Sequence, residues 1–341
     1  MPRALVVCPG PEFSVADVYH GWIKGLQLCG YDVMPYDLGT RLTWAHHAYL
    51  KRMDGTFQQA FPELEDVAGF GVSGIAKAAY YWWPELVVFI SGFYIDYELV
   101  KVMQARNCKV VCVFTESPYE DTRQLAIADT FDAVMVNDPT HLDVFKERTT
   151  ALYSPHCYDP DIHHPGPSDH KSDVAFVGTG YPSRQAFMER VDWSGIDLAL
   201  AGNWEHASDE LQAHVIHDVK NCVDNTDTAS IYRGTKASFS LNRAETNGDL
   251  MDTADGWAIG PREVELAACE TWFPRQSRGE SDALFGDILP TFSSPEELGD
   301  LLRWGLSHPD ETKSAAEAAR AAIADRTFDK NARELIRAVG L

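Results

Sequence analysis

The stretch DVAFVGTGYPSR, residues 173–184, combines an apolar strand, a glycine-containing turn and the start of a helix. Pro182 stands near the first helical turn, where its missing N–H costs no hydrogen bond. Gly178 and Gly180 let the backbone approach a ligand, and the helix N-terminus offers N–H groups to a phosphate, to which Arg184 would add a forked contact. Tight strand-to-helix turns use glycine without a ligand as well, so the motif leaves both interpretations open.

Strands and helices alternate on both sides of this stretch, in two series along the 341 residues. Fully apolar runs such as residues 86–90 and 109–114 are typical of strands buried on both faces of a parallel sheet. Residues 157–173 interrupt the alternation and are rich in Pro, His and Asp, as is typical of an interdomain linker. The sequence therefore predicts an α/β protein with two doubly wound, Rossmann-like domains and an interdomain cleft. We expect an N-terminal, acceptor-side domain at 1–157, a linker at 158–172, a second domain at 173–325 and a C-terminal helix at 326–341.

The formal net charge of −22 argues against unmodified duplex DNA as a partner, because an acidic protein is repelled by phosphate backbones. The strongest apolar run, residues 86–95, is too short to span a membrane, and the first residues lack a secretory h-region. Seven cysteines without a C-x-x-C pair fit buried thiols in a reducing compartment better than a metal site. We expect a soluble, cytoplasmic protein with no membrane span.

A second informative stretch, GPREVELAACETWFP (residues 260–274), joins an apolar helical face to charged groups in its first turns. With the usual winding of the sheet, Glu265 would face the same cleft as the Gly178 turn, where a carboxylate accepts both hydroxyls of a ribose. Arg262 would contact phosphate or hold Glu265. An Arg–Glu pair three residues apart is also a common and weakly stabilising surface feature.

Two other strands carry candidate donor contacts. LALAGNWE (residues 198–205) ends with Asn203 and Trp204, which suit a base or a sugar, although turn formation and packing account for the same residues. TKASFSLNR (residues 235–243) has Lys236 before a strand and Asn242 after it. The alternative to a donor contact is that Lys236 is an ordinary charged residue flanking the strand.

Taken together, these motifs resemble the nucleotide-sugar half of a GT-B glycosyltransferase, and most closely the CgeB-like, spore-maturation group of glycosyltransferase-like proteins. The segments that occur in that family's order and spacing are FVGTGYPSR (176–184), LAGNW (200–204), KASFSLN (236–242), GPREVELAAC (260–269) and TFSSPEELGDLLRWGLSHPDE (291–311). VFTESPYED (113–121) resembles the family's strand followed by an acid-Ser-Pro turn, and YDPDIHHP (158–165) its interdomain segment. The resemblance covers most of the chain and implies the GT-B fold.

The resemblance also implies roles for single residues. Glu265 would hold the nucleotide ribose, Arg262 and Lys236 would neutralise the diphosphate, and the turn at 178–180 would lie against the donor. Two positions depart from the pattern: Trp257 stands where the wider retaining GT-B families have a first glutamate, and Glu270 where a glycine is usual. The predicted donor-binding residues are Gly178, Gly180, Arg184, Asn203, Trp204, Lys236, Asn242, Arg262 and Glu265.

The sequence thus predicts a glycosyltransferase that moves a hexosyl or pentosyl group from a nucleotide-diphospho-sugar, such as a UDP-sugar, to a protein, glycan or small-molecule acceptor. The donor is a co-substrate, and no cofactor is expected. We expect metal-independent transfer, because arginine, lysine and a helix N-terminus can stabilise the departing diphosphate. Glu116 is the candidate catalytic base, with helix N-capping as its alternative role. A catalytically inactive nucleotide- or sugar-binding protein is the alternative function, supported by Trp257.

Overall fold

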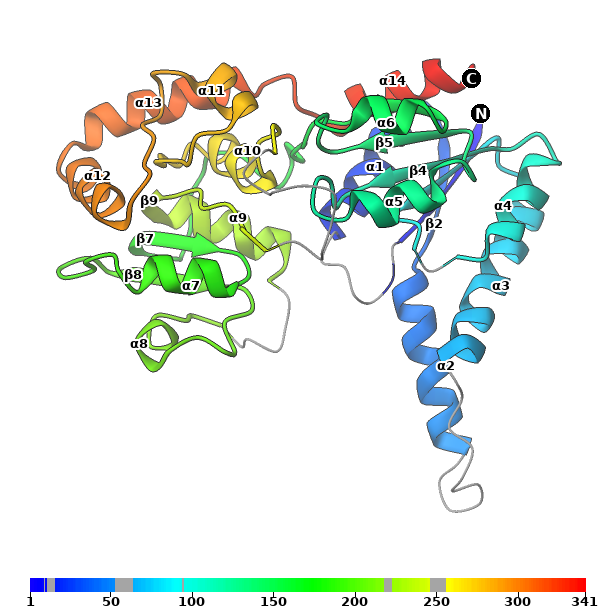
Figure 1. Ribbon diagram of the computed structural model, residues 1–341, viewed down its shortest axis with the longest axis horizontal. Helices are drawn as coiled ribbons and strands as arrows, with labels where there is room; N and C mark the ends of the chain where they lie inside the picture. The colour runs from blue at the N-terminus through cyan, green and yellow to red at the C-terminus, as the bar shows by residue number, and fades with distance from the viewer. Residues whose placement is uncertain (9, 11–15, 53–63, 94, 218–222, 246–255) are drawn as a thin grey trace. The chain divides into compact units, whose positions relative to one another are not determined.

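The computed structural model describes residues 1–8, 10, 16–52, 64–93, 95–217, 223–245 and 256–341, and it divides into two compact units (Figure 1). The first unit comprises Met1–Pro155 and Phe328–Leu341, and the second comprises His156–Thr327. The segment expected to be a linker, residues 158–172, therefore belongs to the second unit. The C-terminal helix belongs to the first.

The first unit is built on a parallel sheet with the strand order β2-β1-β3-β4-β5-β6 among the described residues. The strands are β1 (Arg3–Val7), β2 (Asp32–Tyr36), β3 (Leu86–Ile90), β4 (Lys109–Phe114), β5 (Ala133–Val136) and β6 (Thr150–Tyr153). The central strands β3 and β5 are buried at every position, as expected when helices cover both faces of a parallel sheet.

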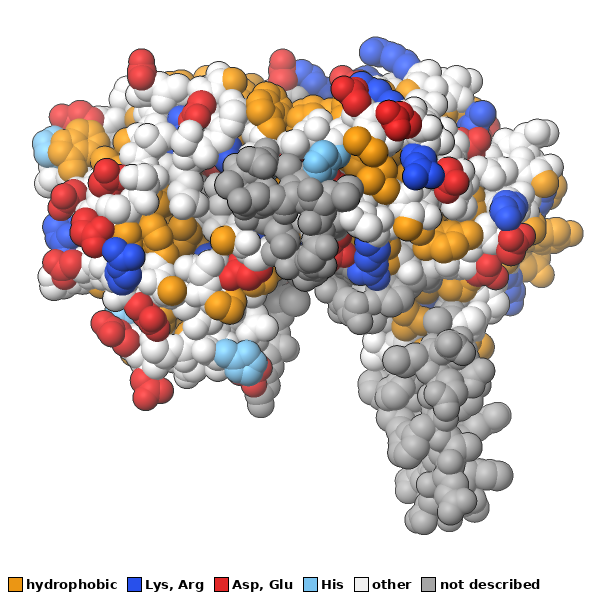
Figure 2. Space-filling view, viewed as in Figure 1, with side chains coloured by type: hydrophobic (Ala, Val, Ile, Leu, Met, Phe, Trp, Pro, Cys, Tyr) orange, Lys and Arg blue, Asp and Glu red, His pale blue; other side chains and the backbone are white. Residues whose placement is uncertain are grey.

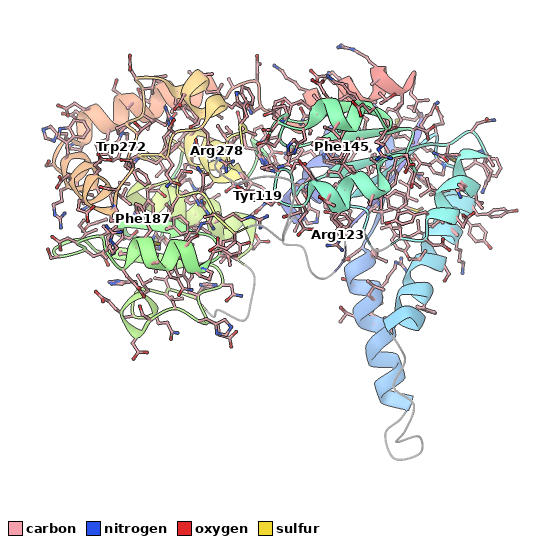
Figure 3. All side chains as sticks on the ribbon, in the orientation of Figure 1. Tyr119, Arg123, Phe145, Phe187, Trp272 and Arg278 are labelled. Atoms are coloured by element: carbon pink, nitrogen blue, oxygen red, sulfur yellow. The ribbon has the colours of Figure 1, made fainter. Side chains whose placement is uncertain are left out.

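The helices of the first unit are α1 (Ala16–Leu28), α2 (Leu38–Arg52), α3 (Leu64–Trp82), α4 (Tyr97–Gln104), α5 (Asp121–Ala128), α6 (Leu142–Lys146) and α14 (Phe328–Val339). Helix α14 packs closely on α1 because α1 has glycines at the contact. A Cβ on Gly25 would lie 2.7 Å from the Phe328 backbone. Phe145 of α6 packs on Phe114 of β4, with ring centroids 5.7 Å apart (Figure 3).

The second unit has a parallel sheet with the strand order β8-β7-β9, formed by β7 (Ser172–Val177), β8 (Leu198–Ala201) and β9 (Thr235–Ser238). Isolated parallel bridges from Ser240 to Arg275 and from Arg275 to Thr291 continue the sheet beyond β9. From β7 the chain passes to β8, which pairs with one side of β7, and then to β9, which pairs with the other side. Adjacent β7 and β9 therefore form a switch point in the winding of the sheet.

The helices of the second unit are α7 (Pro182–Met188), α8 (Asp209–Gln212), α9 (Asn225–Gly234), α10 (Pro261–Ala268), α11 (Gly279–Phe285), α12 (Pro295–Ser307) and α13 (Pro309–Ala322). Aromatic pairs pack two of these helices against neighbouring segments of the unit. Phe187 of α7 packs on Phe292, with ring centroids 5.7 Å apart, and Trp272 packs on Trp304 of α12 at 6.0 Å (Figure 3).

The surface carries charges of both signs. On the face drawn in Figure 2, basic side chains of the described residues lie singly among acidic ones. The exclusion of duplex DNA remains a prediction from net charge. Within the described part of the chain, no helix is both long and apolar enough to cross a membrane.

Several of the described cysteines are buried, as the sequence predicts. Cys108, Cys112 and Cys269 lie in the interior. Complete burial raises the pKa of the Cys112 thiol well above its ordinary value, which keeps it in the protonated, unreactive form. Cys222 lies outside the described residues.

Helix α10 ends in a turn that explains Glu270. The N–H of Glu270 donates to the Ala267 carbonyl at 3.1 Å, and that of Thr271 donates to the Leu266 carbonyl at 3.0 Å. This pattern is a Schellman motif, in which the residue after the helix adopts a left-handed conformation that favours glycine. Glu270 adopts it with φ 56°, and its carboxylate pairs with Arg320 of α13 at 2.9 Å. The turn explains why glycine is usual here, and the ion pair gives this glutamate a partner.

We expect Glu270→Gly to be more stable than Glu270→Ala by about 1 kcal/mol, because both variants lose the ion pair and only alanine keeps the strained backbone. Urea unfolding of the two variants measures the difference. The matched variant Arg320→Ala should resemble Glu270→Ala, with a loss of at most about 1 kcal/mol from the wild type. Equal stability of the glycine and alanine variants would show that the turn carries no strain.

Candidate functional site

The candidate site of the second unit lies at its switch point, between the loops that follow β7 and β9. Arg184 of α7 joins the two loops: its Nε donates to the Leu241 carbonyl at 3.1 Å and its Nη1 to the Thr179 carbonyl at 3.0 Å. Arg184 is 8% exposed, and its guanidinium is engaged by the loops themselves. Arg184 therefore holds the two loops together, and the forked phosphate contact stays a prediction.

Arg262 of α10 lies directly against the Gly178 turn. Its Nε donates to the Val177 carbonyl at 2.8 Å, and its guanidinium stacks over the Phe176 ring at 4.1 Å from the centroid. A Cβ added to Gly178 would come within 2.2 Å of Arg262 Nη2. Only glycine leaves room for the arginine at this position, where φ is also +152°. The two predicted residues are thus brought together, with a cation at the carboxyl end of β7.

Glu265 lies one turn along α10 from Arg262, in contact with Tyr232 of α9. The Tyr232 hydroxyl and the Arg262 guanidinium both favour the ionised form of Glu265. Burial raises the pKa of the Glu265 carboxyl to about 7, against the opposing effects of Arg262 and of the Tyr232 hydroxyl. The carboxylate is therefore poised between its neutral and ionised forms near physiological pH.

The neighbouring acid, Glu263, has a different environment and is fully buried. Its carboxylate accepts hydrogen bonds from the Ser240 hydroxyl at 3.0 Å and the Ser281 hydroxyl at 2.5 Å. Burial raises the pKa of Glu263, while the two hydroxyls and the nearby cations Arg275 and Arg278 act in the opposite direction. Glu263 thus ties α10 to the end of β9 and to α11. In the sequence, Glu263 is one of the charged groups of residues 260–274, and local spacing gives no sign of its two serine partners.

The N-terminus of α7, the expected phosphate position, receives a carboxylate from the chain itself. Glu245 accepts hydrogen bonds from the Ser183 N–H at 2.7 Å and from the Ser183 hydroxyl at 2.9 Å. Although burial favours the neutral acid, these bonds lower the pKa of Glu245, so the group is held as an anion. An anionic group bound at this helix end would compete with Glu245.

Two residues predicted to contact the donor lie away from the Gly178 turn or are buried. Trp204 is completely buried, and its ring lies so close to Gly180 that a Cβ there would be 2.4 Å away. It packs in the core and cannot stack on a base. Lys236 lies near the amino ends of β7 and β9, where it pairs with Asp173 at 2.7 Å. The Gly178 turn lies at the carboxyl ends, so Lys236 is at the opposite edge of the sheet.

The remaining predicted positions lie on loops around the site. Asn203 is exposed after β8, and its side chain accepts the Glu205 N–H at 3.2 Å, which is the turn role considered as its alternative. Asn242 follows β9 and is partly buried, and its N–H donates to Gln276 Oε1 at 2.8 Å. Trp257, where the resemblance implies a glutamate, is 41% exposed and packs against Gly279 at the start of α11.

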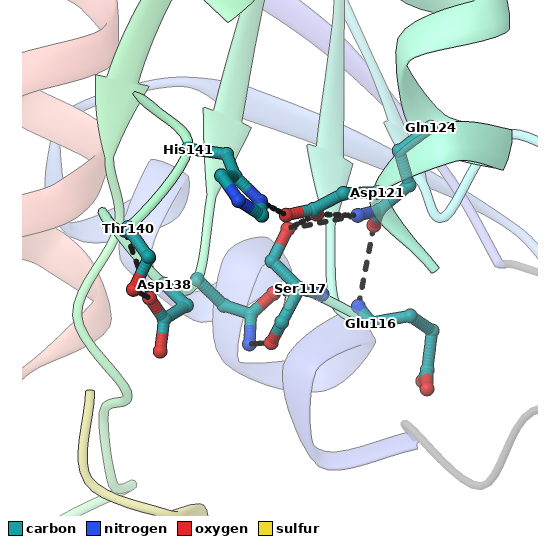
Figure 4. Close-up of polar contacts among 8 residues, drawn as sticks. Glu116, Ser117, Asp121, Gln124, Asp138, Thr140 and His141 are labelled. Carbon is teal, nitrogen blue, oxygen red and sulfur yellow. Dashed lines mark hydrogen bonds and ion pairs between the residues drawn. The ribbon is translucent and has the colours of Figure 1, made fainter. Parts of the chain in front are cut away.

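In the first unit, a polar network lies at the carboxyl ends of β4 and β5 (Figure 4). Asp121 is 1% exposed and accepts hydrogen bonds from the Ser117 hydroxyl at 2.5 Å and the Gln124 amide at 2.9 Å. Its second oxygen lies 2.8 Å from Nδ1 of His141. The predicted base, Glu116, adjoins this network through its backbone N–H, while its carboxylate points away from the other labelled residues (Figure 4). The sequence motif drew attention to Glu116, and nothing in local spacing pointed to His141.

Comparisons with known proteins identify the class of fold. A glycosyl transferase-like family model matches residues 184–337, which include α10 and the loop after β9. Sucrose-phosphate synthase from Thermosynechococcus elongatus superimposes with a TM-score of 0.63 at 12% identity, covering 99% of this chain and 98% of that one. HepE from Anabaena, in complex with UDP and glucose, gives 0.61 at 13% identity, with 99% and 100% covered. No curated protein sequence matches the chain.

The protein therefore has the GT-B fold of these glycosyltransferases, as the sequence predicts. A protein from Listeria monocytogenes assigned as a UDP-N-acetylglucosamine 2-epimerase superimposes equally well, with a TM-score of 0.61 at 10% identity over 99% of this chain and 95% of that one. Because one fold carries different reactions, the function must be argued from the site.

The raised pKa of Glu265 predicts how stability depends on pH. A carboxyl whose pKa rises from 4.5 in the unfolded chain to about 7 in the folded protein contributes stability below pH 4.5 that is lost as pH rises through 7. We expect Glu265→Gln to be more stable than the wild type at pH 8, by at most about 3 kcal/mol, and similar to it at pH 5. Urea unfolding at both pH values measures this. An exposed control, Glu205→Gln, should follow the wild type, and a Glu265→Gln variant that does so too would contradict the burial of that carboxyl.

Proposed function

We propose that this protein transfers a sugar from a nucleotide-diphospho-sugar to the hydroxyl of an acceptor. The observation that carries the proposal is the apposition of Arg262 and the Gly178 turn at the switch point of the second unit, with Glu265 one helical turn away. Ligands of open α/β sheets bind at such switch points. The glycosyl transferase-like match over residues 184–337 supports the same assignment.

Each residue of this group suits one part of the donor. Arg262 is held by the Val177 carbonyl and the Phe176 ring, so its guanidinium is already oriented when a diphosphate arrives. Such a fixed cation stabilises the negative charge that develops on the departing diphosphate. Glu265, when ionised, accepts hydrogen bonds from the two ribose hydroxyls. Gly178 leaves room for the Arg262 guanidinium beside the turn, and the loop containing Asn242 borders the site.

UDP is the first nucleotide to test, since HepE was solved with UDP and glucose bound. The acceptor is proposed to be a protein, a glycan or a small molecule. Transfer without a metal and a cytoplasmic location remain parts of the proposal. The alternative is a binding protein without catalysis, which the side chain of Trp257 favours because it supplies no carboxylate where the wider retaining families have one.

Binding of UDP-glucose tests the donor site. At pH 8 we expect Glu265→Gln to weaken binding by about 1.5–3 kcal/mol, the typical contribution of hydrogen bonds to a charged group. Arg262→Gln should weaken it at least as much. Lys236→Gln should leave affinity unchanged because it lies at the other edge of the sheet. Isothermal titration calorimetry measures all three, and a loss of affinity in the Lys236 variant would instead support its predicted contact with the diphosphate.

The same titration has a pH dependence that belongs to Glu265. The two phosphates of UDP-glucose stay ionised between pH 6 and pH 8, so a change in affinity over that range reports on the protein. Because Glu265 ionises at a pKa of about 7, wild-type affinity should rise with pH, whereas the Glu265→Gln variant should show a flat profile. The two candidate functions differ in UDP release: a transferase would release UDP from the bound donor, whereas a binding protein without catalysis would not. Tight binding without release would favour the alternative.

A further inference from the structure

Helix α3 ends in a group of exposed aromatic side chains at the amino edge of the first unit's sheet. Tyr80 and Tyr81 lie in its last turn, and Trp83 follows the helix shortly before β3 begins at Leu86. Their exposed fractions are 64%, 74% and 58%, and we call these three residues the aromatic patch. The Asp121 network of the same sheet lies at the carboxyl ends of β4 and β5, so the patch is a separate surface.

Contacts within the unit hold these rings in a fixed arrangement. Trp82, which lies between them in the sequence, anchors the helix end through its indole N–H, which donates to the Ala4 carbonyl at 3.2 Å. The Tyr80 ring meets the rings of Tyr81 and Trp83 nearly at right angles, with interplanar angles of 88° and 70°. A perpendicular pair covers only one ring face, so much of the aromatic surface stays open to a partner.

The backbone of Trp83 has a conformation that favours glycine. Trp83 follows the last residue of α3 with φ 56°, and its N–H donates to the Ala79 carbonyl at 3.0 Å. Glycine is the usual residue in this left-handed position after a helix, where a bulky residue is rare. The exposed indole is therefore present at a cost to folding, which is typical of a side chain with a role in binding.

A cation is stacked on the aromatic patch. The Arg106 guanidinium lies over the Trp83 ring at 3.7 Å from the centroid and over the Tyr80 ring at 5.0 Å. Within the described part of the chain its side chain makes no ion pair, although the sequence has 51 acidic residues against 29 lysines and arginines. Stacking leaves N–H donors at the edge of the guanidinium available for a forked pair with a carboxylate. Lys77, exposed and one helical turn before Tyr81, adds a second positive charge.

Flat apolar rings beside a stacked cation suit one class of ligand. A pyranose ring presents a face of C–H groups that packs on an aromatic ring, and a uronic acid adds a carboxylate at the ring edge for an arginine. Duplex DNA carries about one charge per 1.7 Å, whereas a glycan with a carboxylate on alternate sugars is much less densely charged and less repelled by a protein of −22. The patch has the size of a short oligosaccharide, well below the about 800 Å² a side of a stable protein interface.

We propose that the aromatic patch and Arg106 bind an acidic glycan, whose sugar rings stack on Tyr81 and Trp83 while a uronic carboxylate pairs with the guanidinium. The patch is a secondary binding surface, where no bond is made or broken. A glycan is one of the acceptor classes of the proposed function, and only this link to the transfer reaction rests on that function. A chain held at the patch would be present at a high effective concentration for transfer.

The test is isothermal titration calorimetry of the full chain with a hyaluronan hexasaccharide, in which glucuronate alternates with N-acetylglucosamine. We expect Trp83→Gly to weaken binding by about fivefold or more, because it removes a ring, and to stay folded, because glycine suits the left-handed backbone. Tyr81→Ala should act similarly, and Arg106→Gln should weaken binding about threefold. The matched control is Trp44→Ala, a 67% exposed tryptophan of α2, which should bind like the wild type.

Other probes separate a glycan site from a merely charged or apolar surface. Neutral cellohexaose should bind more weakly than the acidic hexasaccharide, and binding of the latter should weaken as salt is added. Hexaglutamate that binds as tightly as the glycan would indicate an acidic protein segment as the partner and overturn the proposal. Binding of Trp83 to vesicles of phosphatidylglycerol and phosphatidylcholine, without glycan binding, would indicate a membrane contact and overturn it too.

UDP-glucose, titrated into the same variants, keeps this proposal apart from the proposed function. Its affinity should be unchanged in Trp83→Gly and Arg106→Gln. A wild type that binds hyaluronan but not UDP-glucose would support the patch and contradict the proposed function. A wild type that binds UDP-glucose but no hyaluronan, or a Trp83→Gly variant with full affinity for the glycan, would overturn the patch alone.

Discussion

The position of α10 against the sheet is the constraint on which the second unit's candidate site depends. Two charged residues in the first turn of the helix fix it: Arg262 donates to the Val177 carbonyl of β7, and Glu263 accepts from Ser240 just after β9. These contacts reach the two strands of the switch point separately. The helix therefore cannot slide along either strand without breaking a buried polar contact, and an unsatisfied buried carboxylate is costly. Glu265 is placed as a consequence.

The three acids of this helix show how environment divides one residue type among different tasks. Glu263 is fully buried and accepts hydrogen bonds from two hydroxyl groups, and Glu270 lies at the helix end in an ion pair with Arg320. Glu265 has one hydroxyl partner and one cation, which do not fully offset its desolvation. A carboxylate with acceptor capacity left over at the edge of a switch point is suited to hydroxyl donors from a ligand. The two fully engaged acids are not.

Much of the fold could be predicted from local sequence patterns, because apolar runs indicate buried strands and glycines at their ends indicate tight turns. The βα unit at residues 173–184 and the helix at Pro261–Ala268 both occur as their residues predict. Residue order alone does not show which face of a strand end is buried, so the sequence could not show that Trp204 lies in the core. Lys236 comes before β9, as expected, and the parallel register of β7 with β9 places that end at the edge opposite the Gly178 turn.

The first-unit network was harder to predict from the sequence, because its members come from two separate segments, the loops after β4 and β5. Ser117 and Asp121 are close in the chain, whereas His141 joins them only when β4 and β5 pair in register. The sequence motif therefore points to Glu116, whereas the contact between His141 and Asp121 depends on that strand pairing.

The charge of the chain adds a condition that the proposed donor site must meet. The proposed donor, a nucleotide-diphospho-sugar, is an anion, and a protein with a formal charge of −22 repels it at long range. Affinity must then come from short-range contacts that salt screens only weakly, such as those of a guanidinium already held in place by a carbonyl and an aromatic ring. The N-terminus of α7 offers no such contact, because the Glu245 carboxylate already occupies it and an anionic ligand would have to compete with it. The ligand's phosphates gain most at positions where the protein has fixed a cation beforehand, which makes Arg262 the electrostatic centre of the second unit's site.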